Sequence, residues 1–295
     1  ALRMTQVAPR HLAALIAIAL IWGLNLIVSK VGLAYVPPML FTALRFAILA
    51  ALLWPFLRVV PGKMNAMVVA ALLSGTINFG LLFAGLSIAQ TGSAVAIASQ
   101  LGIPFTTLLS VALLGETVRW RRWTGIAMSF AGVLLIGLDP VVFDYWPSLA
   151  LVIASALVGS LGVIAVKRLP EFKPLEVQAW FSWVSLPILG LMAVVLHRPS
   201  LQDLAEIPLP AWGAIAFTAI CSSLVAHTGF YYLVQRYPVT SVAPLTTLSP
   251  VFSVIFGVTL LDDALTPRIL VGGIVTLAGV LIITLRERRL TDTGN

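Results

Sequence analysis

Ten apolar stretches, each about long enough to cross a lipid bilayer, fill most of this chain. They lie at about 11–33, 39–57, 66–89, 93–114, 120–138, 147–167, 174–196, 209–235, 239–261 and 267–285. Of the 295 residues 60% are apolar and 10% charged, so too little polar surface exists to coat a water-soluble globule of this size. The connections are too short for a soluble domain. The sequence predicts an all-α integral membrane protein with ten transmembrane helices in a lipid bilayer.

The basic residues alternate with the apolar stretches. If the N-terminus is cytoplasmic, the segments placed inside hold fourteen Lys and Arg and those placed outside hold two, Arg198 and Arg268. This positive-inside bias predicts that both termini are cytoplasmic. The inside set is Arg3, Arg10, Arg58, Lys63, Arg119, Arg121, Arg122, Lys167, Arg168, Lys173, Arg236, Arg286, Arg288 and Arg289. Because the net charge of +7 is spread in this way, we do not expect a nucleic-acid partner.

The chain carries the same faint pattern twice. LLGE at 113–116, followed by Gly125, Gly132 and Val133, recurs 147 places later as LLDD at 260–263, followed by Gly272, Gly279 and Val280. Further matches in the same order pair Lys30 with Lys167, Gln90 with Gln235 and, after a one-residue gap, Pro104 with Pro250. Two five-helix repeats, 11–138 and 147–285, are therefore expected, joined by a turn-like linker. Because each has an odd number of spans, the second should be inverted, as in transporters with a midplane substrate site.

These residues resemble a known family. Through Trp22-Gly23-x-Asn25 and through the LLGE and LLDD segments with their trailing glycines, nearly the whole chain resembles the EamA-type transporters of the drug/metabolite transporter superfamily. More narrowly it is similar to the bacterial exporters of aromatic amino acids. The resemblance implies a multi-pass carrier of small organic solutes in the bacterial inner membrane, made of two five-helix repeats.

Polar side chains at membrane depth usually face the interior of the helix bundle or a cavity. Several share faces of the predicted spans and, with nearby aromatic rings, could enclose a central pocket. The alternative is that these side chains form hydrogen bonds between helices, each of which contributes about 0.6 kcal/mol to stability on average. The candidate substrate-binding residues are Trp22, Asn25, Asn78, Phe79, Phe83, Ser99, Gln100, Ser223, His227, Tyr231, Thr246 and Ser249.

Pro104 and Pro250 occupy corresponding spans, the fourth and the ninth. Proline inside a membrane helix frees a backbone carbonyl, which persists only where protein or water satisfies it. Paired interruptions of this kind point to a binding site, so we interpret both prolines as hinges. A static kink that only improves packing is the alternative.

Every Asp and Glu falls at the end of a span or in a loop. A proton antiporter or a dedicated carrier of organic cations generally keeps a carboxylate near the bilayer centre. We therefore expect a uniporter, and the resemblance implies that its cargo is a neutral amino acid, above all an aromatic one. Proton-coupled efflux of drugs or other metabolites, with His227 as a relay, is the alternative.

Two cations, Lys30 and Arg45, lie within spans close to the outer interface. Either could bind a substrate carboxylate. The favoured interpretation is that both side chains keep their apolar stems in the membrane and extend their charged ends to the interface.

Other functional classes have little support. The chain contains no H-E-x-x-H or G-x-S-x-G motif, its three histidines are far apart, and Cys221 is its only cysteine. We therefore expect that the protein is not an enzyme, binds no metal or cofactor and forms no internal disulfide. No filter-like loop suggests a channel. The oligomeric state cannot be read from the sequence.

Overall fold

The computed structural model describes residues 8–115, 118–236 and 247–291, and these form helices with no strand. The first half contains α1 (Pro9–Leu33), α2 (Pro38–Leu53), η1 (Trp54–Phe56), α3 (Met64–Ala71), η2 (Leu72–Ile77), α4 (Asn78–Ile88), α5 (Gly92–Ser99), α6 (Gly102–Leu114) and α7 (Trp120–Gly137). After α8 (Pro140–Phe143), the second half contains α9 (Trp146–Lys167), α10 (Pro174–His197), α11 (Leu201–Ala205), α12 (Leu209–Ala216), η3 (Phe217–His227), α13 (Thr228–Arg236), α15 (Leu248–Leu261) and α16 (Pro267–Thr291).

Local chemistry sets many helix limits. The helices α1, α2, α8, α10 and α16 begin on a proline, whose fixed φ suits the first helical turn and whose missing N–H is not needed there. The helix α6 ends at Gly115, which has a φ of +68° and takes the left-handed conformation that terminates a helix. Asp139 caps α8 by accepting a hydrogen bond from the backbone N–H of Val141.

Eight helical segments in the described part of the chain are long and apolar enough to span a membrane. They correspond to eight of the ten predicted spans, all except the fifth and the ninth. At the fifth position lies α7, which has 18 residues but carries Arg121 and Arg122 in its first turn. At the ninth lies α15, a shorter apolar helix whose predicted first residues, 239–246, lie outside the described residues. The protein is thus a multi-pass, all-helical membrane protein.

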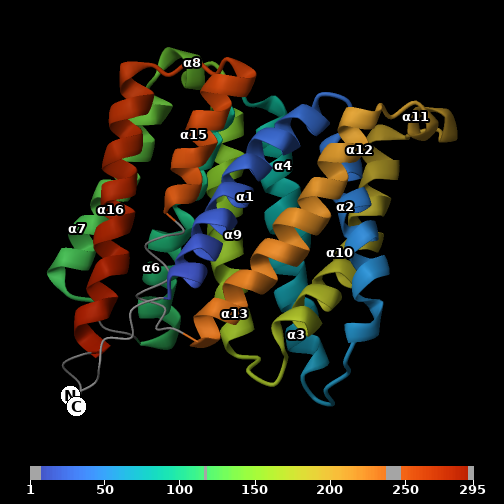
Figure 1. Cartoon of the computed structure of the whole chain (residues 1–295), viewed down its shortest axis with the longest axis horizontal. Coiled ribbons are helices and arrows are strands. Elements are labelled where there is room, and N and C mark those ends of the chain that lie inside the picture. Colours follow the sequence, from blue (N-terminus) through green and yellow to red (C-terminus); the bar gives the residue numbers. More distant parts are fainter. Residues whose placement is uncertain (1–7, 116–117, 237–246, 292–295) are drawn as a thin grey trace.

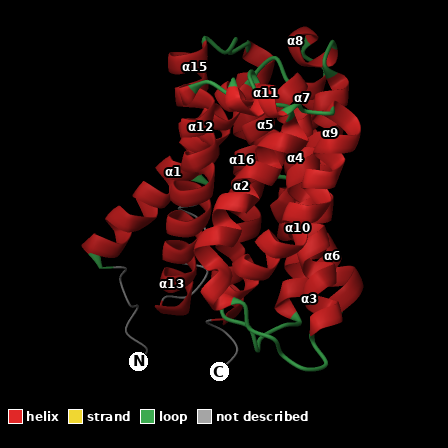
Figure 2. Cartoon of the chain, turned by 90° about the vertical axis from the view of Figure 1, so that its right-hand side faces the viewer, coloured by secondary structure: helices red, strands yellow, loops and turns green. Residues whose placement is uncertain are grey.

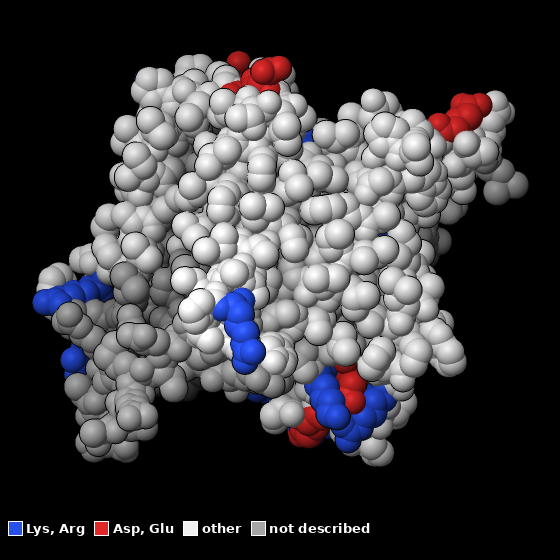
Figure 3. Space-filling view, viewed as in Figure 1, with Lys and Arg blue, Asp and Glu red and all other residues white. Residues whose placement is uncertain are grey.

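The long helices run side by side between two layers of connections (Figures 1 and 2). One layer contains α8 and α11, and we call it the α8 end. The other contains the end of α13 and the loops 57–63 and 168–173, and we call it the α13 end. Figure 3 shows that most lysines and arginines visible on this face lie toward the α13 end, whereas much of the surface above them carries no charge. That surface is what a lipid environment requires.

The helices α7 and α16 cross in antiparallel fashion along a seam of glycines, at the left of Figure 1. A Cβ added to Gly125 would lie 2.7 Å from the carbonyl oxygen of Gly279, and one added to Gly132 would lie 2.5 Å from that of Gly272. Glycine at these positions lets the two backbones approach closely. The contacts are reciprocal, because Gly125 and Gly132 are the counterparts of Gly272 and Gly279.

Other helix contacts come in matched pairs. The helices α2 and α10 pack together, α4 packs on α9 as α1 packs on η3, and α9 packs on α6 as α1 packs on α15. A further match was not predicted. Two π-helical turns begin at Leu72 and Phe217, 145 residues apart, the spacing that also separates Gln90 from Gln235. Such turns insert a residue into an α-helix and are frequent at functional sites.

Candidate functional site

A cavity of about 510 Å³ lies between the helices of both halves. Its wall combines residues from α2, η2, α4, α5 and α6 with residues from α9, α10 and η3. Its size suits a small organic molecule. The lining residues are Arg45, Phe46, Leu49, Ser74, Asn78, Phe79, Ser99, Gly102, Ile103, Thr106, Ala156, Gly159, Ser160, Val163, Val166, Phe172, Pro174, Val177, Gln178, Phe181, Ser182, Ser223 and His227.

The cavity begins at mid-depth and extends toward the α13 end. Arg45, Asn78 and Ala156 lie near the middle of their membrane segments and form its deepest part. From there the wall continues to Val166 at the end of α9 and to Pro174 at the start of α10. Among the described lining residues, none comes from the connections of the α8 end.

Arg45 does not reach the membrane interface, so that expectation was wrong. Its side chain is buried, with 2% of the residue exposed, and its Nη2 donates a 2.6 Å hydrogen bond to Oγ of Ser223. The guanidinium carbon lies 4.0 Å from the ring centroid of Phe79, so the aromatic face contributes a cation–π contact. Arg45 lies near the middle of its span, on the face of α2 that points into the helix bundle, and both its depth and its direction keep the guanidinium away from the interface.

Ser223 is the centre of a polar cluster that we call the Arg45–Ser223–Gln178 cluster. Its hydroxyl accepts from Arg45 and donates 2.9 Å to the carbonyl oxygen of Thr218, five residues earlier in the π-helical segment. Its own carbonyl accepts a 3.1 Å hydrogen bond from Nε2 of Gln178. The sequence interpretation weighed Arg45 but favoured a position at the interface, and it did not include Gln178. An amide inside the apolar stretch 174–196 was the available signal for Gln178.

Asn78 begins α4 directly after the first π-helical turn and packs against α9. Its side-chain Oδ1 accepts a 2.8 Å hydrogen bond from Oγ of Ser155, and its backbone carbonyl accepts another from the same hydroxyl. A Cβ on Gly159 would lie 2.8 Å from that Oδ1, so the absence of a side chain there lets the amide fit. Asn78 therefore forms a hydrogen bond between two helices and also lines the cavity.

His227 and Trp22 lie together at one side of the cavity. The Nδ1 atom of His227 is 2.7 Å from the carbonyl oxygen of Ser222, which also accepts from Nε1 of Trp22 at 3.4 Å. The two rings are 5.0 Å apart. His227 lines the cavity, whereas Trp22 packs behind it.

The remaining predicted binding residues fall into three groups. Phe79 and Ser99 line the cavity, and Phe83 is buried behind Phe79 with its ring stacked on it at 5.9 Å. Asn25, Gln100 and Ser249 are not among the lining residues, although Oδ1 of Asn25 is buried without a hydrogen-bond partner. The side chain of Tyr231 and the whole of Thr246 lie outside the described residues.

Pro104 lies in the first turn of α6, just after the fourth span breaks at Gln100 and Leu101. Proline has no N–H to donate to the carbonyl four residues earlier, and the proline ring would clash with that carbonyl in a regular helix. The carbonyl of Gln100 accepts instead from the backbone N–H of Ile103 at 3.1 Å. Pro250 occupies the equivalent place in the first turn of α15.

The α8 end is held together by Asp263, the last residue of the LLDD segment. Its Oδ2 accepts hydrogen bonds from the backbone N–H and from the hydroxyl of Ser93 at the start of α5, at 2.8 and 2.7 Å. Its Oδ1 lies 3.6 Å from Nζ of Lys30, which also donates to the carbonyl oxygen of Gln90. Lys30 therefore pairs with an acid near the end of α1 instead of extending to solvent. The ends of α1, α5 and α15 are joined by one carboxylate.

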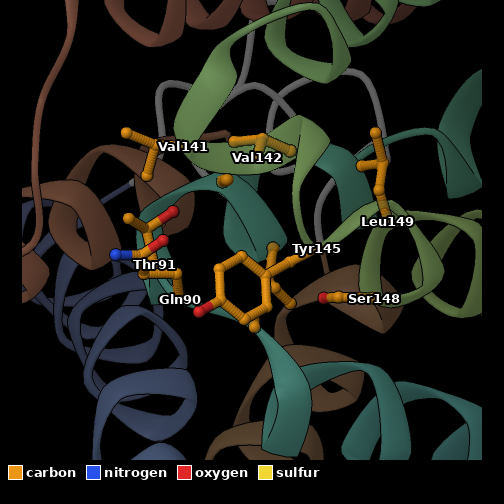
Figure 4. Close-up of a pocket in the computed structure, with 10 residues that line it drawn as sticks. Gln90, Thr91, Val141, Val142, Tyr145, Ser148 and Leu149 are labelled. Atoms are coloured by element: carbon orange, nitrogen blue, oxygen red, sulfur yellow. The ribbon is translucent and has the colours of Figure 1, made fainter.

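A second cavity at this end is small. It has a volume of about 20 Å³, which is enough for one water molecule. Figure 4 shows Tyr145 at its centre, with Gln90 and Thr91 on one side, Ser148 on the other and Val141 and Val142 of α8 above. This cavity is too small for an organic solute.

The loops of the α13 end carry ion pairs. Lys63 pairs with Glu171 at 2.9 Å, and the hydrogen bond from Lys63 lowers the pKa of that carboxyl. Arg58 lies 3.6 Å from Glu176. These pairs connect the loop 57–63 to the loop 168–173 and to the start of α10.

Comparison with known proteins gives a consistent result. The model of the EamA-like transporter family matches residues 10–138 and 146–285. The chain is 24% identical over 288 residues to a "Probable amino-acid metabolite efflux pump" of Escherichia coli, covering 94% of this chain and 96% of that protein. It is 27% identical over 194 residues to a "Probable terminal-alkyne amino-acid exporter" of Streptantibioticus cattleyicolor, covering 64% of each.

A solved crystal structure with 22% sequence identity has the same fold. It superposes with a TM-score of 0.67 and covers 95% of this chain and 98% of its own.

Proposed function

Because the chain belongs to the EamA-like transporter family, we propose that it exports neutral amino acids, aromatic ones above all, by alternating access through the central cavity. Its relatives are named transporters and efflux pumps, and the chain is a membrane transporter of small molecules rather than an enzyme. The amino-acid substrate is suggested by the names of two relatives and by a cavity that combines polar groups with aromatic rings.

One observation carries the mechanism: the cavity extends from mid-depth to the α13 end, while Asp263 joins three helices at the α8 end. This is the arrangement of a carrier open toward one side. Its opposite state would part α1, α5 and α15 and bring the walls together at the α13 end. Pro104 and Pro250 are the proposed hinges of that movement.

We also propose that the ten spans form two inverted five-helix repeats, 11–138 and 147–285. The reciprocal, antiparallel glycine seam of α7 and α16 supports this, because counterparts related by a two-fold axis in the membrane plane must cross in opposite directions. The matched helix contacts support it as well. The α13 end, with both basic loops, would face the bacterial cytoplasm.

The second candidate is proton-coupled efflux of drugs or other metabolites. It is favoured by His227, an ionisable group on the cavity wall. Uniport is preferred because no carboxylate lines the cavity among the described residues.

Uptake into proteoliposomes tests the proposal. A panel of amino acids, amines and nucleosides is offered to the purified protein, with and without an imposed pH gradient. We expect uptake of aromatic amino acids down their own concentration gradient, which persists when the pH gradient is collapsed. Failure to carry any amino acid would refute the substrate class, and flux that stops without the gradient would refute uniport.

A further inference from the structure

Arg45 carries a positive charge that the described part of the protein does not neutralise. Two of its three side-chain nitrogens, Nε and Nη1, are buried without a hydrogen-bond partner, and Nη2 has only the hydroxyl of Ser223. The ion pairs of the described residues involve other cations, Lys30, Arg58 and Lys63. A buried cation without an anion is costly, and its guanidinium presents a planar fork of donors. Other atoms of the residue line the cavity, so a ligand in the cavity toward which the guanidinium shifts is the available partner.

A second unpartnered group lies in the same cluster. Oε1 of Gln178 is buried without a donor, while Nε2 of that amide bonds the carbonyl of Ser223. Exchanging the two amide atoms would leave the other one unpaired, so the orientation of the amide does not remove the mismatch. The cluster thus offers donors at Arg45 and an acceptor at Gln178, two residues that both bond Ser223.

Toward the α13 end the cavity wall combines apolar and hydroxyl side chains. The rings of Phe172 and Phe181 line it together with Val163 and Val177, and the hydroxyl residues there are Ser74, Thr106, Ser160 and Ser182. An elongated ligand with one charged end would place its apolar part there.

From these observations we propose that Arg45 binds the carboxylate of the transported solute, so that a carboxylate is the group this carrier requires. The carboxylate replaces the hydroxyl of Ser223 as acceptor and takes both ends of the guanidinium fork. An α-ammonium group, where present, donates to Oε1 of Gln178. Because Arg45 belongs to the first half and Gln178 to the second, the bound zwitterion connects the two halves. This inference rests on the proposed function for the identity of the cavity as the transport site.

Binding to the purified full-length protein tests the inference without transport. The thermal melting temperature in detergent is measured with 3-phenylpropionate, its uncharged isostere 3-phenylpropionamide, L-phenylalanine and phenethylamine. We expect both carboxylates to raise the melting temperature, and the amide and the amine to leave it unchanged. Equal stabilisation by 3-phenylpropionamide or phenethylamine, or none by the carboxylates, would overturn the inference on the wild-type protein alone.

Variants then locate the site. Arg45→Met should weaken carboxylate binding at least tenfold, and Arg45→Lys should restore it in part because it keeps the charge but not the fork. Arg122→Met is the matched control, since Arg122 is also buried with an unpaired Nε but does not line the cavity. Undiminished binding in Arg45→Met would disprove the role of Arg45. In proteoliposomes, transport of phenylalanine that survives Arg45→Met would refute this inference but leave amino-acid export standing.

Discussion

The hydroxyl of Ser129 lies 3.4 Å from the carbonyl oxygen of Thr276, and the hydroxyl of Thr276 lies 3.5 Å from the carbonyl oxygen of Ser129. The two residues are 147 positions apart, the spacing between the LLGE and LLDD segments. Each also bonds the carbonyl four residues earlier, that of Gly125 and that of Gly272. A contact that a residue makes with its own counterpart lies on a local two-fold axis, as in an isologous dimer interface.

We expect Gly132→Ala to destabilise the protein. A Cβ there would lie 2.5 Å from the backbone oxygen of Gly272 and 2.3 Å from the Thr276 hydroxyl, so α7 and α16 must separate, at a cost of about 1–3 kcal/mol. Thermal unfolding in detergent measures this. Gly190→Ala in α10 is the control, because nothing lies within 4 Å of its added Cβ. An equal melting temperature for the two variants would contradict the close seam.

Asp263→Asn should loosen the α8 end, because it removes the ion pair with Lys30 and weakens the cap on α5. The reporter is a cysteine in place of Val95, a buried residue beside the small cavity there, in a Cys221→Ser background. A membrane-impermeant thiol reagent should label it several-fold faster in the variant.

The control for that experiment is Asp262→Asn, which changes the neighbouring exposed acid. Asparagine tolerates the left-handed conformation of this position, where φ is +51°. Labelling that is equally fast in both variants would show that Asp263 does not hold this end closed.

Asn78→Ala should reduce transport several-fold while leaving expression intact, because it removes an amide from the cavity wall and leaves the Ser155 hydroxyl with one acceptor less. Initial rates of uptake into proteoliposomes measure the effect. Asn65→Ala makes the same change at an exposed position of α3 and should have no effect. A wild-type rate for Asn78→Ala would remove this residue from the site.

Pro104→Ala should slow turnover more than it weakens binding. Alanine restores an N–H that can bond the carbonyl of Gln100, and this favours a continuous helix across the break between α5 and α6. The maximal transport rate and the concentration for half-maximal rate separate the two effects. Pro147→Ala, in the first turn of α9, is the control. If both variants change the maximal transport rate equally, the break at Gln100 is a static kink rather than a hinge.

The lengths of the apolar stretches were enough to predict a helical membrane protein, but they did not predict the breaks within its helices. Hydropathy predicts that a stretch spans the bilayer, but the break at Gln100 depends on a proline four residues later and on the backbone N–H of Ile103, which satisfies the freed carbonyl. The linker at 139–147 was expected to be a turn. It contains α8 because Asp139 provides an N-cap.

The candidate site was predicted in part. Asn78, Phe79, Ser99, Ser223 and His227 line the cavity because polar and aromatic residues on shared helix faces do point inward. Arg45 was misjudged because depth along a helix does not tell which way a long side chain turns. That direction is set here by partners on the other half, Ser223 above all, which no local pattern in the sequence reveals.

The short π-helical segment Leu72–Ile77 sets the rotation of the helix that follows it. A single π-helical turn holds one residue more than regular α-helical winding, and deleting that residue would rotate the remainder of the helix by about 100°. Asn78, which comes directly after the segment, would then turn away from the cavity. The direction of this amide therefore depends on the number of residues that precede it in the helix, and a first half one residue shorter there would present a different face of α4 to the solute.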